Sequence, residues 1–464
     1  MRTLPMDFFF GAAFSGPQTE GAYKLDGKLE NIWDTWSDER IGDFYNQVGS
    51  YVGNDFYHRY ESDIQMLKSL GLTSFRTSIQ WSRLLDQDGK INPEGAAFYH
   101  KLLACAKENG MEVFINLYHF DMPTYLFRRG GWESREVVEA YAHYAEQAFT
   151  EFAGEVKYWF TFNEPIVEPE QRYREGFWYP FVQDIGRSIA TQYHIALAHS
   201  LATAAFRRLQ KSGVIPADVK IGLINCFAPP YTRENPSPAD LEAVRMEDGL
   251  HNRWWLDLVA EGHLPQDVLD TLAEKGAPAP IRPGDNEIFQ QGIVDWLGFN
   301  YYQPKRVQAP KQDCDANGNP VFSEPYLWPE RRINKSRGWE IYPKGIYDFG
   351  MVLKENYPNL TFFISENGMG VENEDQFRDA NGVIQDDYRI DFVREHLEWI
   401  AQAIEEGARC QGYHYWAVID NWSWANAFKN RYGFVEVRLQ DGYNRRCKKS
   451  AEWLKKVAIS KEIV

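Results

Sequence analysis

The sequence is poor in cysteine and short of positive charge. Its 464 residues include five cysteines, at positions 105, 226, 314, 410 and 447, and no two of them form a CxxC pair. An odd and scattered set argues against a disulfide framework or a zinc site, and it fits a reducing compartment. Lys and Arg total 50 against 66 Asp and Glu, and the resulting net charge of −16 argues against a general nucleic-acid or anionic-membrane surface.

Long apolar runs and cofactor motifs are also missing. No apolar run approaches the length of a membrane span. The N-terminal run FFFGAAF is short for a signal peptide, and Arg2 is the only basic residue before it. We therefore expect a cytoplasmic protein without a membrane partner. No G-x-G-x-x-G follows a strand, and there is no P-loop or cluster of His and Cys, so we expect no nucleotide cofactor and no metal.

What the chain does contain is a regular alternation of apolar runs and amphipathic stretches. Phe56, Tyr60, Ile64, Leu67 and Leu70 recur at helical spacing before Gly71, and a second helix is expected after Asn92 and Pro93. Eight runs read as strands: FFFGAAF, SFRTSI, MEVFINLYH, EVKYWFTFNEP, VKIGLINCF, VDWLGFNYY, LTFFISENG and QGYHYWAVID. No Pro-, Gly- or Ser-rich linker divides them. The pattern predicts an α/β fold, a single (β/α)8 TIM barrel over residues 1–464 with long βα loops.

Two glutamates stand where predicted strands end. The fourth strand ends in TFNEP, which places Glu164 at the rim, and the seventh ends in ISENG, which places Glu366 there. Active sites of such barrels lie at the carboxyl ends of the strands, and two converging carboxylates are what glycosidic bond cleavage requires. The unpatterned stretch 303–340 follows the sixth strand, so we expect it to overhang the same face.

Several segments together resemble glycoside hydrolase family 1 from about Phe8 to Trp453. They are FFFGAAFSGPQTEGA, YHRYESDIQMLKSLGLTSFRTSIQWSR, NLYHFDMP, TFNEP, LGFNYYQ, ISENG and DNWSW, in this order. The resemblance implies a retaining mechanism in which Glu164 is the acid/base and Glu366 the nucleophile. It further implies that Arg76 and Tyr302 contact the nucleophile, although Arg76 is equally compatible with a structural ion pair inside the barrel.

The resemblance also implies a sugar-binding shell. Paired hydrogen-bonding groups and aromatic faces are the chemistry that a carbohydrate requires. Taken singly, each of these residues could be a satisfied core or loop residue, and their joint alignment favours the site. The glycone-binding positions are Gln18, His119, Asn163, Trp416 and Trp424, and the aglycone-binding positions are Trp339 and Tyr125.

The segment after the eighth strand bears on which sugar is bound. Family members acting on unmodified glucosides typically have Glu-Trp here, whereas this chain has Ser423 and Trp424. A carboxylate would repel a sugar 6-phosphate, while a serine hydroxyl can donate to it. The 6-phospho-β-glycosidase branch resembles this chain in the serine and in Tyr432, but Asn430 stands where that branch has lysine. Lys429 is one residue earlier, which leaves open which of the two faces a phosphate.

These observations favour a 6-phospho-β-glucosidase that acts on a small phosphorylated disaccharide or aryl glycoside. Three alternatives remain at this point: a β-glucosidase or β-galactosidase on unphosphorylated sugars, a 6-phospho-β-galactosidase, and a barrel that binds glycans without cleaving them. The presence of both carboxylates disfavours the last. No sequence pattern indicates an oligomeric state.

Overall fold

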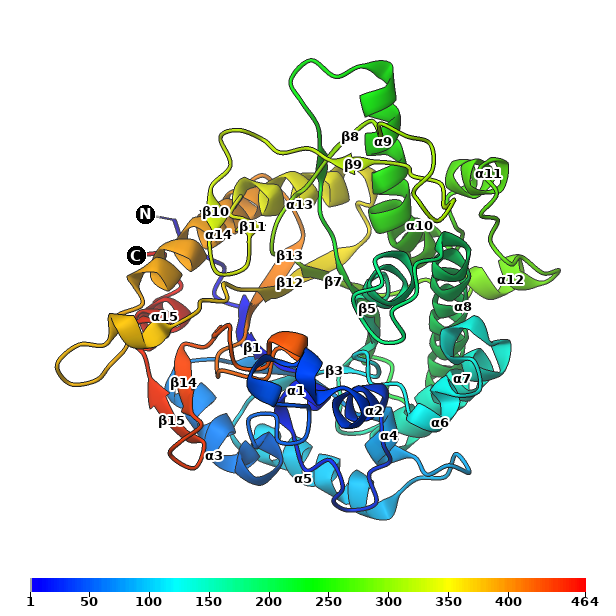
Figure 1. The fold of residues 1–464 in the computed structure, drawn as a ribbon. Coiled ribbons are helices and arrows are strands. Elements are labelled where there is room, and N and C mark those ends of the chain that lie inside the picture. The colour runs from blue at the N-terminus through cyan, green and yellow to red at the C-terminus, as the bar shows by residue number, and fades with distance from the viewer. Residues whose placement is uncertain (1) are drawn as a thin grey trace.

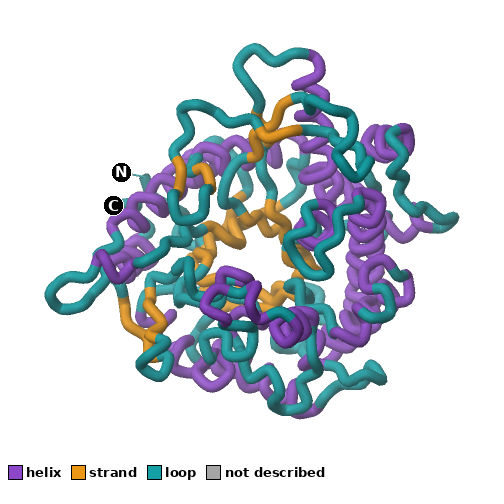
Figure 2. The backbone as a smooth tube through the Cα atoms, in the orientation of Figure 1, coloured by secondary structure: helices purple, strands orange, loops and turns teal. Residues whose placement is uncertain are grey.

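Eight parallel strands close into a barrel at the centre of the molecule, and helices surround it (Figure 1 and Figure 2). The structure is a computed structural model that describes residues 2–464. The barrel strands are β1 (Phe9–Ala13), β2 (Ser74–Ser78), β3 (Glu112–Asn116), β4 (Tyr158–Asn163), β5 (Lys220–Cys226), β7 (Trp296–Asn300), β12 (Thr361–Asn367) and β13 (Cys410–Trp416). Each pairs in parallel with its neighbours, and β1 closes the ring between β13 and β2. The predicted TIM barrel is confirmed.

Every barrel strand is followed by helical structure, as a right-handed β/α alternation requires. The helices are α1 (Gly16–Thr19), α2 (Ile32–Glu39), α3 (Phe56–Ser69), α4 (Trp81–Leu84), α5 (Pro93–Glu108), α6 (Thr124–Phe127), α7 (Arg135–Glu151), α8 (Ile185–Lys211), α9 (Pro238–Asp248), α10 (Trp254–Glu261), α11 (Gln266–Glu274), α12 (Asp285–Phe289), α13 (Lys344–Asn356), α14 (Asp387–Glu405) and α15 (Lys449–Ser460).

Two predicted helices illustrate how the sequence specifies this layer. In α3 the side chains of Phe56, Ile64 and Leu67 are buried against the barrel, as their spacing predicts. Helix α5 begins with Pro93, and the Asn92 side chain caps it by accepting a hydrogen bond from the Glu94 amide. No helix within residues 2–464 is both long and apolar enough to cross a membrane.

The loops at the carboxyl ends of the strands carry small additional sheets. They are built from β6 (Pro230–Tyr231), β8 (Lys305–Gln308), β9 (Glu324–Pro325), β10 (Ile333–Asn334), β11 (Trp339–Glu340), β14 (Val435–Arg438) and β15 (Asn444–Cys447). Four of these strands, β8 to β11, lie in the stretch 303–340, where the sequence shows no periodicity. Of these, β9, β10 and β11 have two residues each, too few to produce a detectable alternation of apolar and polar residues, and β8 has four.

Aromatic rings fill the barrel below the carboxyl ends of the strands. Phe114, Tyr158, Phe160, Trp296 and Phe363 form one buried cluster with Ile224, and Phe9 packs against it. The Phe114 and Tyr158 rings stack with centroids 4.5 Å apart. Because these residues come from strands all round the barrel, the cluster closes its interior and supports the polar residues above it.

Candidate active site

A cavity of about 440 Å³ lies at the carboxyl ends of the barrel strands, and both predicted carboxylates face it. Glu366 belongs to β12, and Glu164 follows the last residue of β4 directly. Two other cavities, of about 510 and 580 Å³, are larger, but neither contains a pair of carboxylates at strand ends. The geometry of the barrel therefore brings together two glutamates that are 202 positions apart in the printed sequence.

The Glu366 carboxylate is held by two donors. Arg76 Nη2 lies 2.5 Å from Glu366 Oε1, and the Tyr302 hydroxyl donates to Oε2 over 2.6 Å. Arg76 is fully buried, so its guanidinium has a strong electrostatic effect on this carboxylate. Burial and the neighbouring Glu366 charge raise the pKa of Tyr302 well above its usual range, so the phenol keeps the proton that it donates. The arrangement fixes the orientation of Glu366 and places a guanidinium charge beside it.

Glu164 has the opposite environment. Burial, and then the charge of Glu366, raise the pKa of Glu164 to about 8, against smaller opposing effects of Asn300 and Arg76. Asn300 Nδ2 donates to Glu164 Oε1 over 2.9 Å. The backbone of Glu164 has a φ of +46°, which is unusual for a residue with a side chain and is typical of strained functional positions. One carboxyl with a raised pKa therefore faces one that is paired with a guanidinium, which is the difference in environment that acid and nucleophile roles require.

The floor between the two carboxylates is a network of amides. Asn163 Oδ1 accepts from Arg76 Nη2 at 3.0 Å and from Asn300 Nδ2 at 3.1 Å. Asn163 is thus beneath the cavity surface, where it links Arg76, which contacts Glu366, to Asn300, which contacts Glu164. His119 lies 3.2 Å from the Asn163 amide nitrogen, and burial followed by the Arg76 charge lowers the pKa of His119 well below its usual range. The imidazole is consequently neutral, as a hydrogen-bonding partner for a sugar should be.

The other predicted glycone positions line the cavity. Gln18, on α1, is held by Ser15 and donates to the Trp422 carbonyl over 2.9 Å. Trp416, at the end of β13, stacks on His119 with 5.9 Å between ring centroids. Trp424 stacks on Trp33 with centroids 4.3 Å apart, which leaves it at the cavity wall. The structure therefore brings four of the five predicted glycone-binding residues to one surface, and Asn163 lies beneath it.

Of the two predicted aglycone-binding residues, only one lines the cavity. Trp339, on β11, lines the cavity, and its ring lies 5.4 Å from that of Tyr302. Tyr125 does not line the cavity. It lies on α6 beside Arg129, whose guanidinium is 5.6 Å from the ring. The prediction placed Tyr125 at the mouth because it follows the third strand closely, but the short α6 turns it away.

The predicted phosphate residues also separate into two pairs. Ser423 and Tyr432 line the cavity, whereas Lys429 and Asn430 do not. Lys429 Nζ lies 3.2 Å from Glu372 Oε1, and its side chain is 39% exposed in a different surface cavity. Asn430 is buried behind the wall, where its Nδ2 donates to the Ser336 carbonyl over 3.3 Å. The expectation that Lys429 or Asn430 faces a phosphate does not match this placement.

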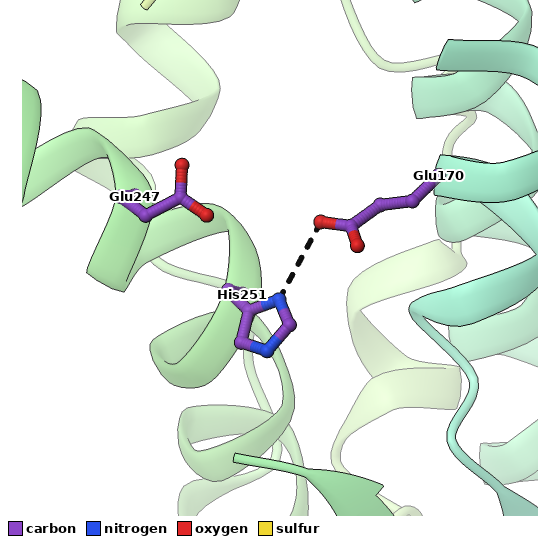
Figure 3. A group of neighbouring side chains, drawn as sticks. All are labelled: Glu170, Glu247 and His251. Carbon is purple, nitrogen blue, oxygen red and sulfur yellow. Dashed lines mark hydrogen bonds and ion pairs between the residues drawn. The ribbon is translucent and has the colours of Figure 1, made fainter. Parts of the chain in front are cut away.

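Sequence reasoning missed a charged group beside the cavity, whose lining includes Glu170 and His251. Figure 3 shows Glu170, Glu247 and His251, with His251 Nδ1 3.4 Å from Glu170 Oε1. Although these are metal-ligating residue types within 4.8 Å of one another, a cation of the protein already neutralises them. Lys305 Nζ is 3.1 Å from Glu170 Oε1 and 2.7 Å from Glu247 Oε1. No motif predicts this group, since Glu170 and His251 lie on π-helical segments, Pro169–Arg174 and Gly249–Arg253.

Arg337 is a second missed residue of the wall. It lies between β10 and β11, and its guanidinium is 4.3 Å from the centroid of the Trp339 ring. Within the sequence it is one of several basic residues in an unpatterned stretch. The signal that could have identified it is the missing lysine at position 430, because Arg337 Nη1 lies 3.5 Å from Asn430 Oδ1.

Comparisons with known proteins agree with this geometry. The model of glycosyl hydrolase family 1 matches residues 1–463. The 6-phospho-beta-glucosidase GmuD of Bacillus subtilis strain 168 is 46% identical over 460 residues, covering 98% of this chain and 97% of that protein. The 6-phospho-beta-galactosidase of Leptotrichia buccalis is 34% identical over 484 residues, covering 100% of both. A solved family 1 β-glucosidase from Thermotoga maritima has a TM-score of 0.88 at 30% identity, covering 99% of this chain and 98% of its own.

Proposed function

The chain belongs to glycosyl hydrolase family 1, and on that premise we propose that it hydrolyses 6-phospho-β-D-glucosides with retention of anomeric configuration. The observation that carries the phosphate specificity is the pair Ser423 and Tyr432, whose side chains line the cavity that contains Glu164 and Glu366. Hydroxyl groups can donate to phosphate oxygens without the repulsion that a carboxylate would cause. The similarity to a 6-phospho-beta-glucosidase over nearly the whole chain supports the same reading.

In the proposed first step, a Glu366 carboxylate oxygen attacks the anomeric carbon of the bound sugar. The bond from that carbon to the aglycone oxygen breaks, and the Glu164 proton passes to this oxygen. Arg76 and Tyr302 hold Glu366 in position for the attack. The products of this step are the free aglycone alcohol and a glycosyl ester of Glu366.

In the second step, water hydrolyses the ester. Glu366 carries no charge while it is esterified, so the repulsion that helps to keep Glu164 protonated is removed. Glu164 can then take a proton from water, whose oxygen attacks the anomeric carbon as the bond to Glu366 breaks. Both glutamates return to their starting states, and the sugar 6-phosphate is released as the β-anomer.

A cytoplasmic location is part of the proposal. The five cysteines are all free in the structure, and they are dispersed over the chain, which fits a reducing compartment. A substrate that carries a phosphate is also one that a cell retains inside its membrane, because the charged group does not cross a bilayer unaided.

The test is a comparison of four aryl glycosides on one preparation: the β-glucoside 6-phosphate, the β-galactoside 6-phosphate and their unphosphorylated forms. We expect kcat/KM to be highest for the glucoside 6-phosphate. A higher value for a neutral glycoside would reject the phosphate specificity. A higher value for the galactoside 6-phosphate would favour a 6-phospho-β-galactosidase activity instead, which the similarity to a 6-phospho-beta-galactosidase supports.

Replacing Ser423 with Glu should invert the preference for phosphate. The new carboxylate would face the 6-phosphate, and a buried like-charge contact costs several kcal/mol. We expect kcat/KM for the glucoside 6-phosphate to fall by roughly 100-fold or more, while the value for the neutral glucoside stays or rises. Ser423→Ala is the control for the lost hydroxyl, with a smaller loss. Equal effects of Ser423→Glu on both substrates would contradict the prediction.

A further inference from the structure

Arg337 is the one cation of the cavity wall that no carboxylate neutralises. The wall contains two basic side chains of permanent charge, Lys305 and Arg337. Lys305 lies within 3.1 Å of Glu170 and 2.7 Å of Glu247. Among the described residues, no Asp or Glu oxygen lies within 4.0 Å of the Arg337 guanidinium. In a chain with a net charge of −16, an uncompensated cation inside a pocket is a candidate anion site.

The guanidinium has donors to spare. Of its five N–H groups, one is directed to Asn430 Oδ1 at 3.5 Å, and Nε is buried without a hydrogen-bond partner in the described chain. The guanidinium carbon Cζ lies over the Trp339 ring, 4.3 Å from its centroid. The ring therefore supports the guanidinium by a cation–π contact, and the Nη groups keep N–H donors that can contact phosphate oxygens.

The loop that carries Arg337 is fastened to the segments that follow β12 and β13. Asn334 Nδ2 donates to the Gly370 carbonyl over 3.0 Å, and the Glu372 amide donates to Ser336 Oγ over 3.0 Å. Asn430 Nδ2 holds the Ser336 carbonyl from the other side. A side chain added to Gly370 would come within 2.6 Å of the Tyr432 ring, which shows how closely these segments pack. Arg337 is thus held at a fixed position beside the Tyr432 segment.

The position of Arg337 also explains why position 430 is an asparagine rather than a lysine. A lysine at this position would place a second cation against Arg337, whereas the asparagine oxygen accepts a hydrogen bond from it. Arg337, in the loop between β10 and β11, therefore takes the place of the lysine that would otherwise stand at position 430, in the segment after β13.

Resting on the proposed function, we propose that Arg337 binds the substrate's 6-phosphate together with Ser423 and Tyr432, and that it determines the preference for phosphorylated sugars. Lys429 takes no part, because its ammonium group pairs with Glu372 outside the cavity.

The test measures kcat/KM for an aryl β-glucoside 6-phosphate and its neutral form in wild type and variants. Arg337→Gln should lower the phosphorylated-to-neutral ratio by roughly 10- to 100-fold, the range for losing charge-assisted hydrogen bonds. Lys335→Gln removes a charge from the same loop at an exposed position and should leave the ratio unchanged, as should Lys429→Gln. Arg337→Lys should retain part of the ratio, and Asn430→Lys in the Arg337→Gln background should restore part of it.

Binding gives an independent measurement. The inhibition constant of glucose 6-phosphate should rise in Arg337→Gln by a similar factor, while that of glucose should not. If wild type prefers phosphorylated substrate and Arg337→Gln keeps the ratio within about threefold, the role of Arg337 is overturned while the proposed function stands. If wild type prefers the neutral glucoside, both are overturned. An unchanged melting temperature of Arg337→Gln would show that the variant is folded.

Discussion

Glu366→Gln is expected to lower kcat/KM for the glucoside 6-phosphate by roughly four to six orders of magnitude, the scale of loss when a covalent nucleophile is removed. Glutamine has nearly the same shape, so it can keep the contact with Tyr302, but its amide oxygen is a poor nucleophile. The Arg76 guanidinium, 2.5 Å from the carboxylate in the wild type, would also lose its counter-charge. Steady-state kinetics with an aryl glycoside measures the effect.

A chemical rescue separates a nucleophile from a group that only stabilises charge. In Glu366→Gly, added azide should restore turnover and give a glycosyl azide of inverted configuration, because azide enters from the side that the carboxylate vacated. Glu372→Gln is the matched control, since Glu372 pairs with Lys429 outside the cavity. Substantial activity in Glu366→Gln, or failure of azide to restore any in Glu366→Gly, would contradict the assignment.

Glu164→Gln is expected to affect substrates according to their leaving group. A disaccharide phosphate needs a proton on its leaving oxygen, so kcat/KM should fall by roughly 10²- to 10⁴-fold. A dinitrophenyl glycoside leaves as a stable phenolate, so its glycosylation step should be nearly unchanged and the glycosyl-enzyme should accumulate. A burst of phenolate followed by slow turnover is the measurement. Equal losses on both substrates would contradict an acid/base role.

The pH dependence follows from the same residue. The proposed acid acts only while protonated, and the pKa of Glu164 is raised to about 8. The kcat/KM of the wild type should therefore be retained below that pH and decline above it, approaching tenfold per pH unit. The decline should be absent for the dinitrophenyl substrate, whose leaving oxygen needs no proton from Glu164. A decline that persists would assign it to another group.

The barrel and its carboxylates could be predicted because their signals are local. Each of the eight strands is a short apolar run flanked by turn residues, and parallel pairing then determines which end of the strand carries the site. Glu164 and Glu366 stand at those ends, so strand prediction alone places them on one face. Arg76, in the middle of β2, needed the family resemblance, because a buried arginine inside a barrel has no sequence signature of its own.

The side chains of the loops could not be predicted in this way. Whether Lys429 or Asn430 faces the cavity depends on the turn after Ser423, in which Trp424 and Ala427 both have positive φ values. The position of the Arg337 side chain depends on long-range contacts, such as the one with Asn430, 93 positions later in the chain. Neither is encoded in a hydrophobic period, because loop conformation is determined by long-range hydrogen bonds rather than by burial of a repeating face.

The aromatic cluster beneath the site has a consequence for the order of events in turnover. Phe114, Tyr158, Trp296 and their neighbours fill the barrel beneath the cavity, so we expect the cavity to open only at the carboxyl ends of the strands. A sugar on the floor can depart only past the position of the aglycone. The alcohol product must therefore leave first and the sugar phosphate last, and the water or acceptor alcohol for the second step enters by that same route. Sugar phosphate should accordingly compete with substrate for the free enzyme, whereas added alcohols should intercept the glycosyl-enzyme.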